Sequence, residues 1–505
     1  MTARQLDGLP AETLSAICEC VGLSHPRSVL SFALVNKHFY SVASAFLYRS
    51  IAFKAGSPEE RAQDAQRCEH LLRRDSAFQH VRRFVVYPRH GHPLDFARES
   101  SDPLKWQRMP FEKLIGSPFV GHEQAMRAFM DSLSWGHPNL TPAQEAYQYD
   151  ASWKPLSRLV KLLPALTDFV FACSDQLPPC ILETLHKHFT GSTPNRLRLH
   201  VCNFMLHSLA DAEFDPHEEA LASSPLLHGI WVHYQDTNGY DWLKRPNYHG
   251  DAVVDLVAGF APNLQEVRLF HRYGNETDED SNYRPPPPAW KGFPKCISNK
   301  GEEAQQSLGS LQYLELGGID EYDSANFSSR RHLSKDVIQR WKSCTDFSVL
   351  CTLKLCQIVL REALVFLVDC CSFPNLTSLT LEYENYTSLG DVELLQKFLC
   401  SLPNLRSLEL PFEGSLQHLS VTAFNPRLTR LQLSDWPGTL NYKELSSIVQ
   451  RCPLLEHLLV TLPRYRGGAP EVAIYRLIGS LPQLRRLELM LDAGSTTPEA
   501  RAFVP

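Results

Sequence analysis

A short leucine pattern recurs along this chain and constrains its fold more than any other feature. The pattern is L-x-x-L-x-L, as in Leu376-Thr-Ser-Leu379-Thr-Leu381. Clear copies begin at Leu264, Leu311, Leu350, Leu376, Leu405, Leu428, Leu455 and Leu484, and weaker ones at Val81, Leu166, Pro194 and Leu227. The last five clear copies are 29, 23, 27 and 29 residues apart, which is the length that one strand and one return helix need.

Proline precedes most of these copies at a fixed distance. It stands two residues before the first position in eight of the twelve copies, at Pro164, Pro225, Pro262, Pro374, Pro403, Pro426, Pro453 and Pro482. Proline cannot continue a helix, and it pushes the preceding residue toward extended geometry. Each of these prolines therefore indicates where a helix ends and a strand begins.

The segments between the copies have the spacing of amphipathic helices. Ile474, Leu477, Ile478 and Leu481, for example, fall at i, i+3, i+4 and i+7. One strand–helix unit cannot bury its own apolar face, whereas stacked units share a continuous core. We therefore predict an α/β fold in which a small N-terminal helical module precedes a leucine-rich-repeat solenoid of parallel strands with return helices. The alternative, an ordinary α/β sheet, is disfavoured because its buried strands are usually unbroken apolar runs.

Residues 7–51 differ from the repeats and predict three short helices. Leu14 and Ile17 lie on one face of the first helix, and Val29 and Leu30 belong to a second short one. The third carries Phe39, Val42, Ala43, Phe46 and Leu47 at i, i+3, i+4, i+7 and i+8. A bundle this small has a marginal core, so we expect it to dock on a partner.

The order of motifs in this module resembles the F-box. The resemblance runs from Leu9-Pro10-x-Glu12-x-Leu14-x-x-Ile17 through Ser28-Val29-Leu30 to Leu34-Val35-Asn36-Lys37-His38-Phe39-Tyr40, and ends in Leu47-Tyr48-x-x-Ile51. With the repeats, it makes the chain similar to the F-box/leucine-rich-repeat family. The resemblance implies that a Skp-type adaptor is contacted by Leu9, Pro10, Leu14, Ile17, Leu30, Val35 and Phe39, where the family often has tryptophan in place of Phe39. The alternative is that these side chains form only the core of the module.

The predicted organisation has four parts. Residues 1–52 form the F-box-like module, 53–160 an irregular lead-in with the first strand and a helix near 123–133, 161–492 the repeats, and 493–505 a tail. Within the repeats, residues 274–306 hold an acidic run and the tetraproline Pro285–Pro288, so we expect a mobile loop there.

Charge and cysteine usage exclude several classes of function. Lys and Arg number 50 against 56 Asp and Glu, a net charge of −6 that does not favour a nucleic-acid partner. The first twenty residues lack the features of a signal peptide, and no apolar run approaches a membrane span. The fourteen cysteines have no metal-ligand spacing. We therefore expect a cytoplasmic or nuclear protein without membrane attachment, metal or cofactor.

No catalytic motif is recognisable, and we expect no catalytic residue in this chain. The family resemblance implies a substrate-recognition subunit of a Skp–cullin–F-box ubiquitin ligase, in which transfer chemistry belongs to the RING subunit and its conjugating enzyme. A protein-binding scaffold that uses the F-box without a cullin is the alternative. An enzyme with an unrecognised site is a third class, which the absence of converging titratable residues disfavours.

The strand pattern also predicts where a protein substrate binds. The leucines at positions 4 and 6 point to the core, so positions 3, 5 and 7 lie on the opposite face of the sheet. The candidate substrate-binding residues on this face are Arg430, Gln432, Trp436, Arg486 and Glu488. Their mixed charge suits a protein or peptide better than a small molecule.

Overall fold

In the computed structural model, the residues described are 8–24, 28–88, 142–173, 176–189, 197–202, 204, 206, 215–236, 248–273, 288–293, 308–319, 332–383, 389–412, 419–435, 440–464 and 467–492. The predicted helix near 123–133, most of the predicted loop at 274–306 and the predicted tail lie outside them. The chain forms two compact units, residues 1–208 with 213–232, and residues 209–212 with 233–505.

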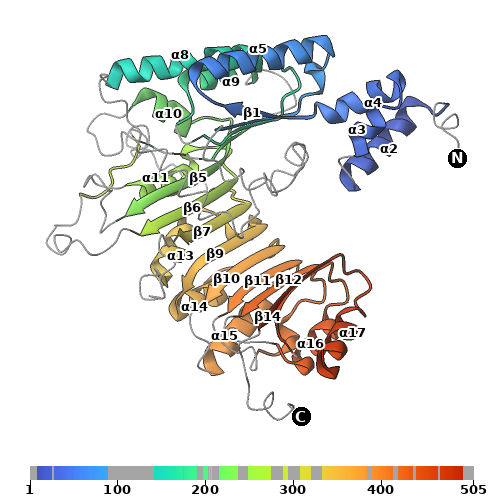
Figure 1. The fold of residues 1–505 in the computed structure, drawn as a ribbon. Helices are drawn as coiled ribbons and strands as arrows, with labels where there is room; N and C mark the ends of the chain where they lie inside the picture. Colours follow the sequence, from blue (N-terminus) through green and yellow to red (C-terminus); the bar gives the residue numbers. More distant parts are fainter. Residues whose placement is uncertain are drawn as a thin grey trace. The chain divides into compact units, whose positions relative to one another are not determined.

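The first unit begins with a cluster of three helices (Figure 1). They are α2 (Ala11–Ser24), α3 (Ser28–Ala33) and α4 (Lys37–Leu47). The Asn36 side chain caps α4 by accepting a hydrogen bond from the Phe39 backbone N–H at 2.9 Å. The buried centre of the cluster contains Cys18, Val29, Ala33 and Ala43, together with Leu14 and Phe39. The predicted three-helix module is therefore present, with a core of modest size.

Asp75 connects the three-helix cluster to the rest of the first unit. It follows α5 (Pro58–Arg74), and its carboxylate accepts hydrogen bonds from the hydroxyls of Tyr40, at 2.8 Å, and Tyr48. The hydrogen bonds from Arg74 and Tyr48 hold the pKa of Asp75 well below its usual range. The carboxylate is therefore ionised at neutral pH and ties the end of α4 to the end of α5.

Five parallel strands form the sheet of the first unit in the order β1-β2-β3-β4-β5. They are β1 (Ser50–Ala55), β2 (Arg83–Pro88), β3 (Asp168–Phe171), β4 (Arg198–Val201) and β5 (Leu227–Asp236), which reaches the boundary of the unit. Phe53, Phe84 and Phe169 stack across the first three strands, with ring centroids 6.0 and 6.1 Å apart. This aromatic column joins strands that lie more than a hundred residues apart in the sequence.

Helices cover this sheet, and two of them occupy parts of the lead-in predicted to be irregular. Besides α5 they are α8 (Pro142–Lys161), α9 (Pro179–Phe189) and α10 (Pro216–Ala222), with the 3-10 turn η1 (Phe78–His80). Ser57 and Glu60 form a capping box at the start of α5. Trp153 of α8 is 1% exposed and packs edge-on against Phe171. Residues 58–74 and 142–160 are thus ordered helix.

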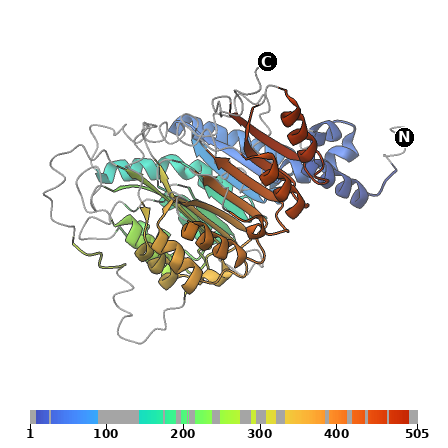
Figure 2. The same ribbon diagram turned by 90° about the horizontal axis from the view of Figure 1, so that it is seen from below.

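The second unit is a parallel sheet with helices on one face (Figure 2). The strands are β6 (Glu266–Tyr273), β7 (Tyr313–Ile319), β8 (His332–Leu333), β9 (Thr352–Val359), β10 (Ser378–Tyr383), β11 (Ser407–Phe412), β12 (Arg430–Asp435), β13 (His457–Pro463) and β14 (Arg486–Asp492). The helices and turns are α11 (His249–Asp255), η4 (Leu256–Phe260), α13 (Lys335–Cys344), η7 (Phe347–Val349), α14 (Arg361–Cys370), α15 (Leu389–Cys400), η9 (Val421–Ala423), α16 (Tyr442–Arg451) and α17 (Ala469–Ile478). Neighbouring strands follow the order of the chain, except that β8 pairs only with β9.

Each of the eight clear leucine copies begins a strand at its third position. The copy at Leu376, for example, begins β10 at Ser378, and the leucines at positions 4 and 6 are buried. Position 4 forms a continuous column across the sheet, in which Leu379, Leu408, Leu431 and Leu458 are register partners and at most 1% exposed. These findings confirm the prediction of parallel strands with return helices. Among the weaker copies, those at Val81 and Leu166 follow the same rule, whereas those at Pro194 and Leu227 miss the strand start by two residues.

Among the helices of the described residues, none combines the length and hydropathy that crossing a lipid bilayer requires.

Candidate functional site

The connection between α3 and α4 exposes two large apolar side chains. Leu34 is 83% exposed and Val35 is 55% exposed. The backbone N–H of Leu34 still donates to Leu30 at 3.1 Å, and Asn36 already caps the next helix, so only these two residues make the turn. Leu34 and Val35, the turn patch, are therefore held in place by helix ends while their side chains face solvent. Exposed apolar groups held in this way are typical of a docking surface.

The other predicted adaptor contacts divide into buried and accessible residues. Leu14 is fully buried and Phe39 is 1% exposed, so both belong to the core of the module rather than to its surface. Pro10 is exposed, whereas Leu9, Ile17 and Leu30 are partly buried. The accessible part of the predicted contact is therefore Val35 and Pro10 with the edges of the partly buried residues. Leu34 belonged to the quoted motif, but nothing in the local pattern indicates its exposure.

A row of polar side chains crosses the second sheet at position 5 of the repeats, on the face opposite the leucine core. Its members, one from each of the strands β6, β7, β9, β10, β11 and β12, are Arg268, Glu315, Lys354, Thr380, Glu409 and Gln432. Each member is the register partner of the next, so the row runs at right angles to the strands. Arg268, Glu315, Thr380 and Gln432 are at most 7% exposed. These four residues lie on the predicted outer face of the sheet, but they are buried there.

Glu315 is the centre of one half of this polar row. Its carboxylate lies 3.4 Å from the Arg268 guanidinium and 3.8 Å from the Lys354 ammonium, and it accepts a hydrogen bond of 2.6 Å from the Tyr313 hydroxyl. The Arg268 guanidinium also lies 4.3 Å from the centre of the Tyr313 ring. Burial raises the pKa of Tyr313 far above its ordinary value, so the hydroxyl keeps the proton that it donates. Two cations thus flank one carboxylate, which satisfies charges that burial would otherwise disfavour.

Glu409 is the centre of the other half. It accepts hydrogen bonds from the Gln432 amide at 2.9 Å and from the Thr380 hydroxyl at 3.3 Å. Burial raises the pKa of Glu409, and the fields of Lys354 and Arg430 only partly offset this effect. Arg430 in turn donates to the Gln432 side-chain oxygen at 3.3 Å. Gln432, a predicted substrate contact, is therefore a buried link between Glu409 and Arg430.

We expect the Glu409→Gln variant to be at least as stable as the native protein at neutral pH. Because the folded-state pKa is raised, the folded protein binds the proton more tightly, and stability falls as pH rises from about 4 through that pKa. Glutamine keeps an acceptor for Gln432 and a donor for Thr380 while removing the charge. Melting temperatures from pH 4 to 8 should therefore favour the variant increasingly as pH rises. Glu409→Leu, which leaves both neighbours without this partner, should instead lose about 1–3 kcal/mol.

The remaining predicted substrate contacts lie near the last strands. Arg430 and Arg486 are exposed, and each occupies position 3 of its repeat, separated by His457 of the intervening strand. The Arg486 guanidinium pairs with Glu488 at 2.5 Å. Two strand spacings put the two arginine backbones about 10 Å apart. Trp436 lies outside the residues that the structure describes.

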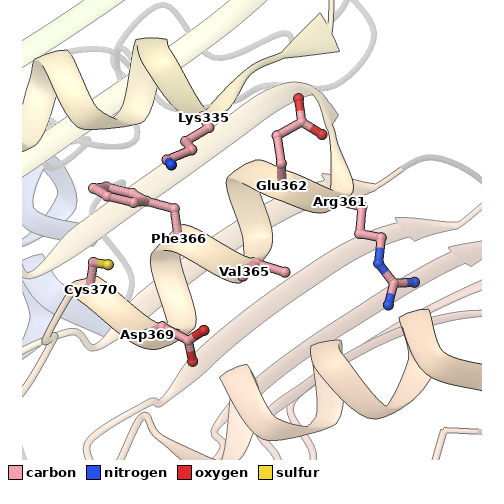
Figure 3. A pocket seen from close by; sticks show the side chains of 7 residues that line it. All are labelled: Lys335, Arg361, Glu362, Val365, Phe366, Asp369 and Cys370. Carbon is pink, nitrogen blue, oxygen red and sulfur yellow. The ribbon is translucent and has the colours of Figure 1, made fainter.

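An open hollow of about 390 Å³ lies on the helical face of the second unit, lined by Lys335, Arg361, Glu362, Val365, Phe366, Asp369 and Cys370 (Figure 3). The Lys335 ammonium lies 5.9 Å from the centre of the Phe366 ring. Arg361 pairs with Asp391 of α15, and Asp369 pairs with Lys397 of the same helix at 3.0 Å. Arg361 and Asp369 of the hollow are thus engaged with a neighbouring helix.

The described residues contain no group of three or more His, Cys, Asp or Glu side chains that could hold a metal ion. Several thiols are also poor nucleophiles. Burial raises the pKa of Cys180 and Cys344 to about 12, and that of Cys68, Cys371 and Cys452 to about 11. Since the thiolate is the reactive form, these five side chains stay protonated and unreactive at neutral pH.

No protein-family model matches this chain, and no curated protein sequence matches it.

Proposed function

We propose that this protein is a substrate-recognition subunit of a Skp–cullin–F-box type ubiquitin ligase. In this proposal residues 1–52 are an F-box-like module that docks on a Skp-type adaptor, and the repeat sheet holds a protein substrate. The observation that carries the proposal is the turn patch, because Leu34 and Val35 lie within the F-box-like motif and are exposed on a module whose own core is small. A desolvated apolar anchor at the centre of an interface is where binding energy concentrates.

The substrate is proposed to bind the sheet face of β12–β14. Arg430, His457 and Arg486 are register partners there, and both arginines are exposed. Two arginines whose backbones lie about 10 Å apart suit a peptide with two acidic or phosphorylated residues, since arginine binds carboxylate and phosphate through paired hydrogen bonds. The polar row of β6–β12 has a different role in this proposal. Its buried, mutually bonded side chains fix the register of the strands that carry the arginines.

Replacing Leu34 and Val35 together with serine is expected to weaken binding of a purified Skp-type adaptor by at least about tenfold. Both side chains are solvent-exposed, so the free energy of unfolding should change by no more than about 0.5 kcal/mol. Binding is measured by calorimetry with the full chain. The matched control is Leu71→Ser with Leu162→Ser, two leucines outside the module that are 39% and 38% exposed. Equal adaptor affinity in native protein and variant, or no adaptor binding by either, would contradict the proposal.

A scaffold that binds the adaptor without a cullin differs from a ligase subunit in one measurable respect. The ligase subunit should retain cullin and RING subunits when it is purified from cells through a tag, and the serine variant should lose them together with the adaptor. Adaptor without cullin in the purified native complex would favour the scaffold.

A further inference from the structure

The last strand of the second sheet breaks the burial pattern of the strands before it. Leu487 is the register partner of Leu458, and Leu491 that of Leu462. Leu458 and Leu462 are each 1% exposed, whereas Leu487 and Leu491 are 40% and 41% exposed. Two positions that are buried in β13 are thus left open to solvent at β14.

The backbone of β14 is open along the same edge. The Arg486 N–H donates to the Glu456 carbonyl on the β13 side at 2.9 Å. Because successive backbone groups of a strand point to opposite sides, those of Leu487, Leu489 and Leu491 face away from β13. No strand of the described residues pairs with this side of β14. A seven-residue edge with three leucines is a template for another strand.

The residues of β14 complement a second copy of themselves. In an antiparallel pair centred on Leu489, each residue faces the residue of the other copy that lies equally far from Leu489 in the opposite direction along the chain. Leu487 then faces Leu491 of the other copy, and Leu489 faces its own equivalent. These are the residues whose backbone groups are open, so three residue pairs exchange about six hydrogen bonds.

The charges of the strand agree with the same register. Arg486 of each copy lies opposite residue 492 of the other, which is an aspartate in the sequence. In this register a basic and an acidic residue type thus occupy facing backbone positions at both ends of the paired segment. Glu488 faces Met490 and keeps its own ion pair with Arg486 at 2.5 Å. A single two-fold axis through Leu489 satisfies the backbone, the leucines and the charged ends, as an isologous interface requires.

We propose that two copies of this protein associate through their β14 edges, forming an antiparallel strand pair centred on Leu489. The pairing covers Leu487 and Leu491 and joins the two sheets edge to edge. It goes beyond the proposed ligase function, because two copies would present two adaptor modules and two substrate faces in one particle. Bivalent binding of this kind raises avidity without any new contact to the substrate.

The full chain should have a mass of twice 57.3 kDa by light scattering at micromolar concentration. Leu487→Lys puts an ammonium opposite Leu491 and should convert the protein to a monomer. Adding Leu491→Glu in the same chain places each new lysine opposite a new glutamate. The double variant should therefore dimerise with a dissociation constant at least about tenfold lower than that of Leu487→Lys alone. No parallel pairing or shifted register predicts this rescue. Leu454→Lys, at a leucine 39% exposed outside β14, is the matched control and should remain dimeric.

Leu489→Cys supplies a readout that keeps the edge apolar. Facing cysteines in this pair lie about 5.5 Å apart at Cα, within reach of a disulfide, so mild oxidation should give a covalent dimer that the native chain does not form. A native chain that is monomeric at all concentrations overturns the proposal. So does a monomer that dimerises only after removal of residues 493–505, because that segment would then cover the edge. Dimerisation unaffected by Leu487→Lys also overturns it, since the interface would lie elsewhere.

Discussion

Replacing Leu408 with alanine is expected to lower the free energy of unfolding by about 2–5 kcal/mol. Leu408 is 1% exposed and lies between Leu379 and Leu431 in the position-4 column of the sheet. Alanine loses the transfer free energy of the missing carbons and leaves a cavity between two strands that hold their places. Because each repeat contacts only its neighbours, the loss should be greatest in β10, β11 and β12. Denaturant titration measures the loss in free energy of unfolding, and hydrogen exchange shows which strands lose protection.

Leu454→Ala is the control for this prediction. The side chain is 39% exposed, so the same chemical change should cost within about 0.5 kcal/mol. A loss at Leu408 no larger than that at Leu454 would contradict the assignment of a continuous leucine core. A loss spread equally over both units would contradict the expected nearest-neighbour behaviour of the repeats.

The sequence is a good guide to the strands of the second unit because their signals are local. A proline that ends the preceding helix, followed by leucines with a fixed spacing, determines both where a strand starts and which face is buried. Six of the eight clear copies carry both signals and those at Leu311 and Leu350 lack the proline, yet all eight begin their strands at the third position. The copies at Pro194 and Leu227 lack part of this signal, and their strands start elsewhere.

The first unit was harder to predict because its helices have thin apolar stripes. In α5 the buried residues are Ala65 and Leu72, so the sequence of this helix shows little of the apolar stripe that predicts a helix. The capping box at Ser57 and Glu60 was the available signal, since a side chain that bonds the third helical N–H marks a helix start. Strand β1 is equally inconspicuous, because its burial depends on Phe53 meeting Phe84 of a distant strand.

Burial at position 5 could not be predicted from the sequence at all. The alternation of a strand assigns Gln432 to the outer face, which is correct, but exposure on that face depends on the neighbouring strands. Gln432 is buried because Glu409 is its register partner and bonds it. At the last strand Glu488 occupies the same position with one neighbour fewer, and it is exposed. Among the predicted substrate contacts, Arg430, Arg486 and Glu488 are therefore exposed, whereas Gln432 is buried.

The N-terminal module shows the same division between local and non-local information. Helical spacing placed Leu14 and Phe39 on the apolar faces of two different helices, but it could not tell a core residue from a docking residue. The structure assigns both to the core. Leu34 is exposed because the two helix ends around it leave no other residue to make the turn.

Replacing Phe39 with alanine is expected to unfold the three-helix module while the sheets remain folded. Phe39 is 1% exposed, its ring centroid lies 4.5 Å from that of Phe32, and truncating a buried phenylalanine typically costs about 3–5 kcal/mol. The whole buried core of this module is small, and it supplies no more than about that amount.

Hydrogen exchange should therefore lose protection throughout α2, α3 and α4 of the Phe39→Ala variant, while α5 and β2 keep theirs. Adaptor binding should disappear with the module, in contrast to Leu34→Ser with Val35→Ser, which should remove binding from a folded module. Tyr40→Phe is the matched control, because it removes a hydroxyl from an exposed neighbour and deprives Asp75 of one of two tyrosine hydrogen bonds. It should cost about 1 kcal/mol at most. Full protection of α4 in Phe39→Ala would show that other contacts within the first unit stabilise the module. The hydrogen bonds from Tyr40 and Tyr48 to Asp75 would then be the first contacts to test.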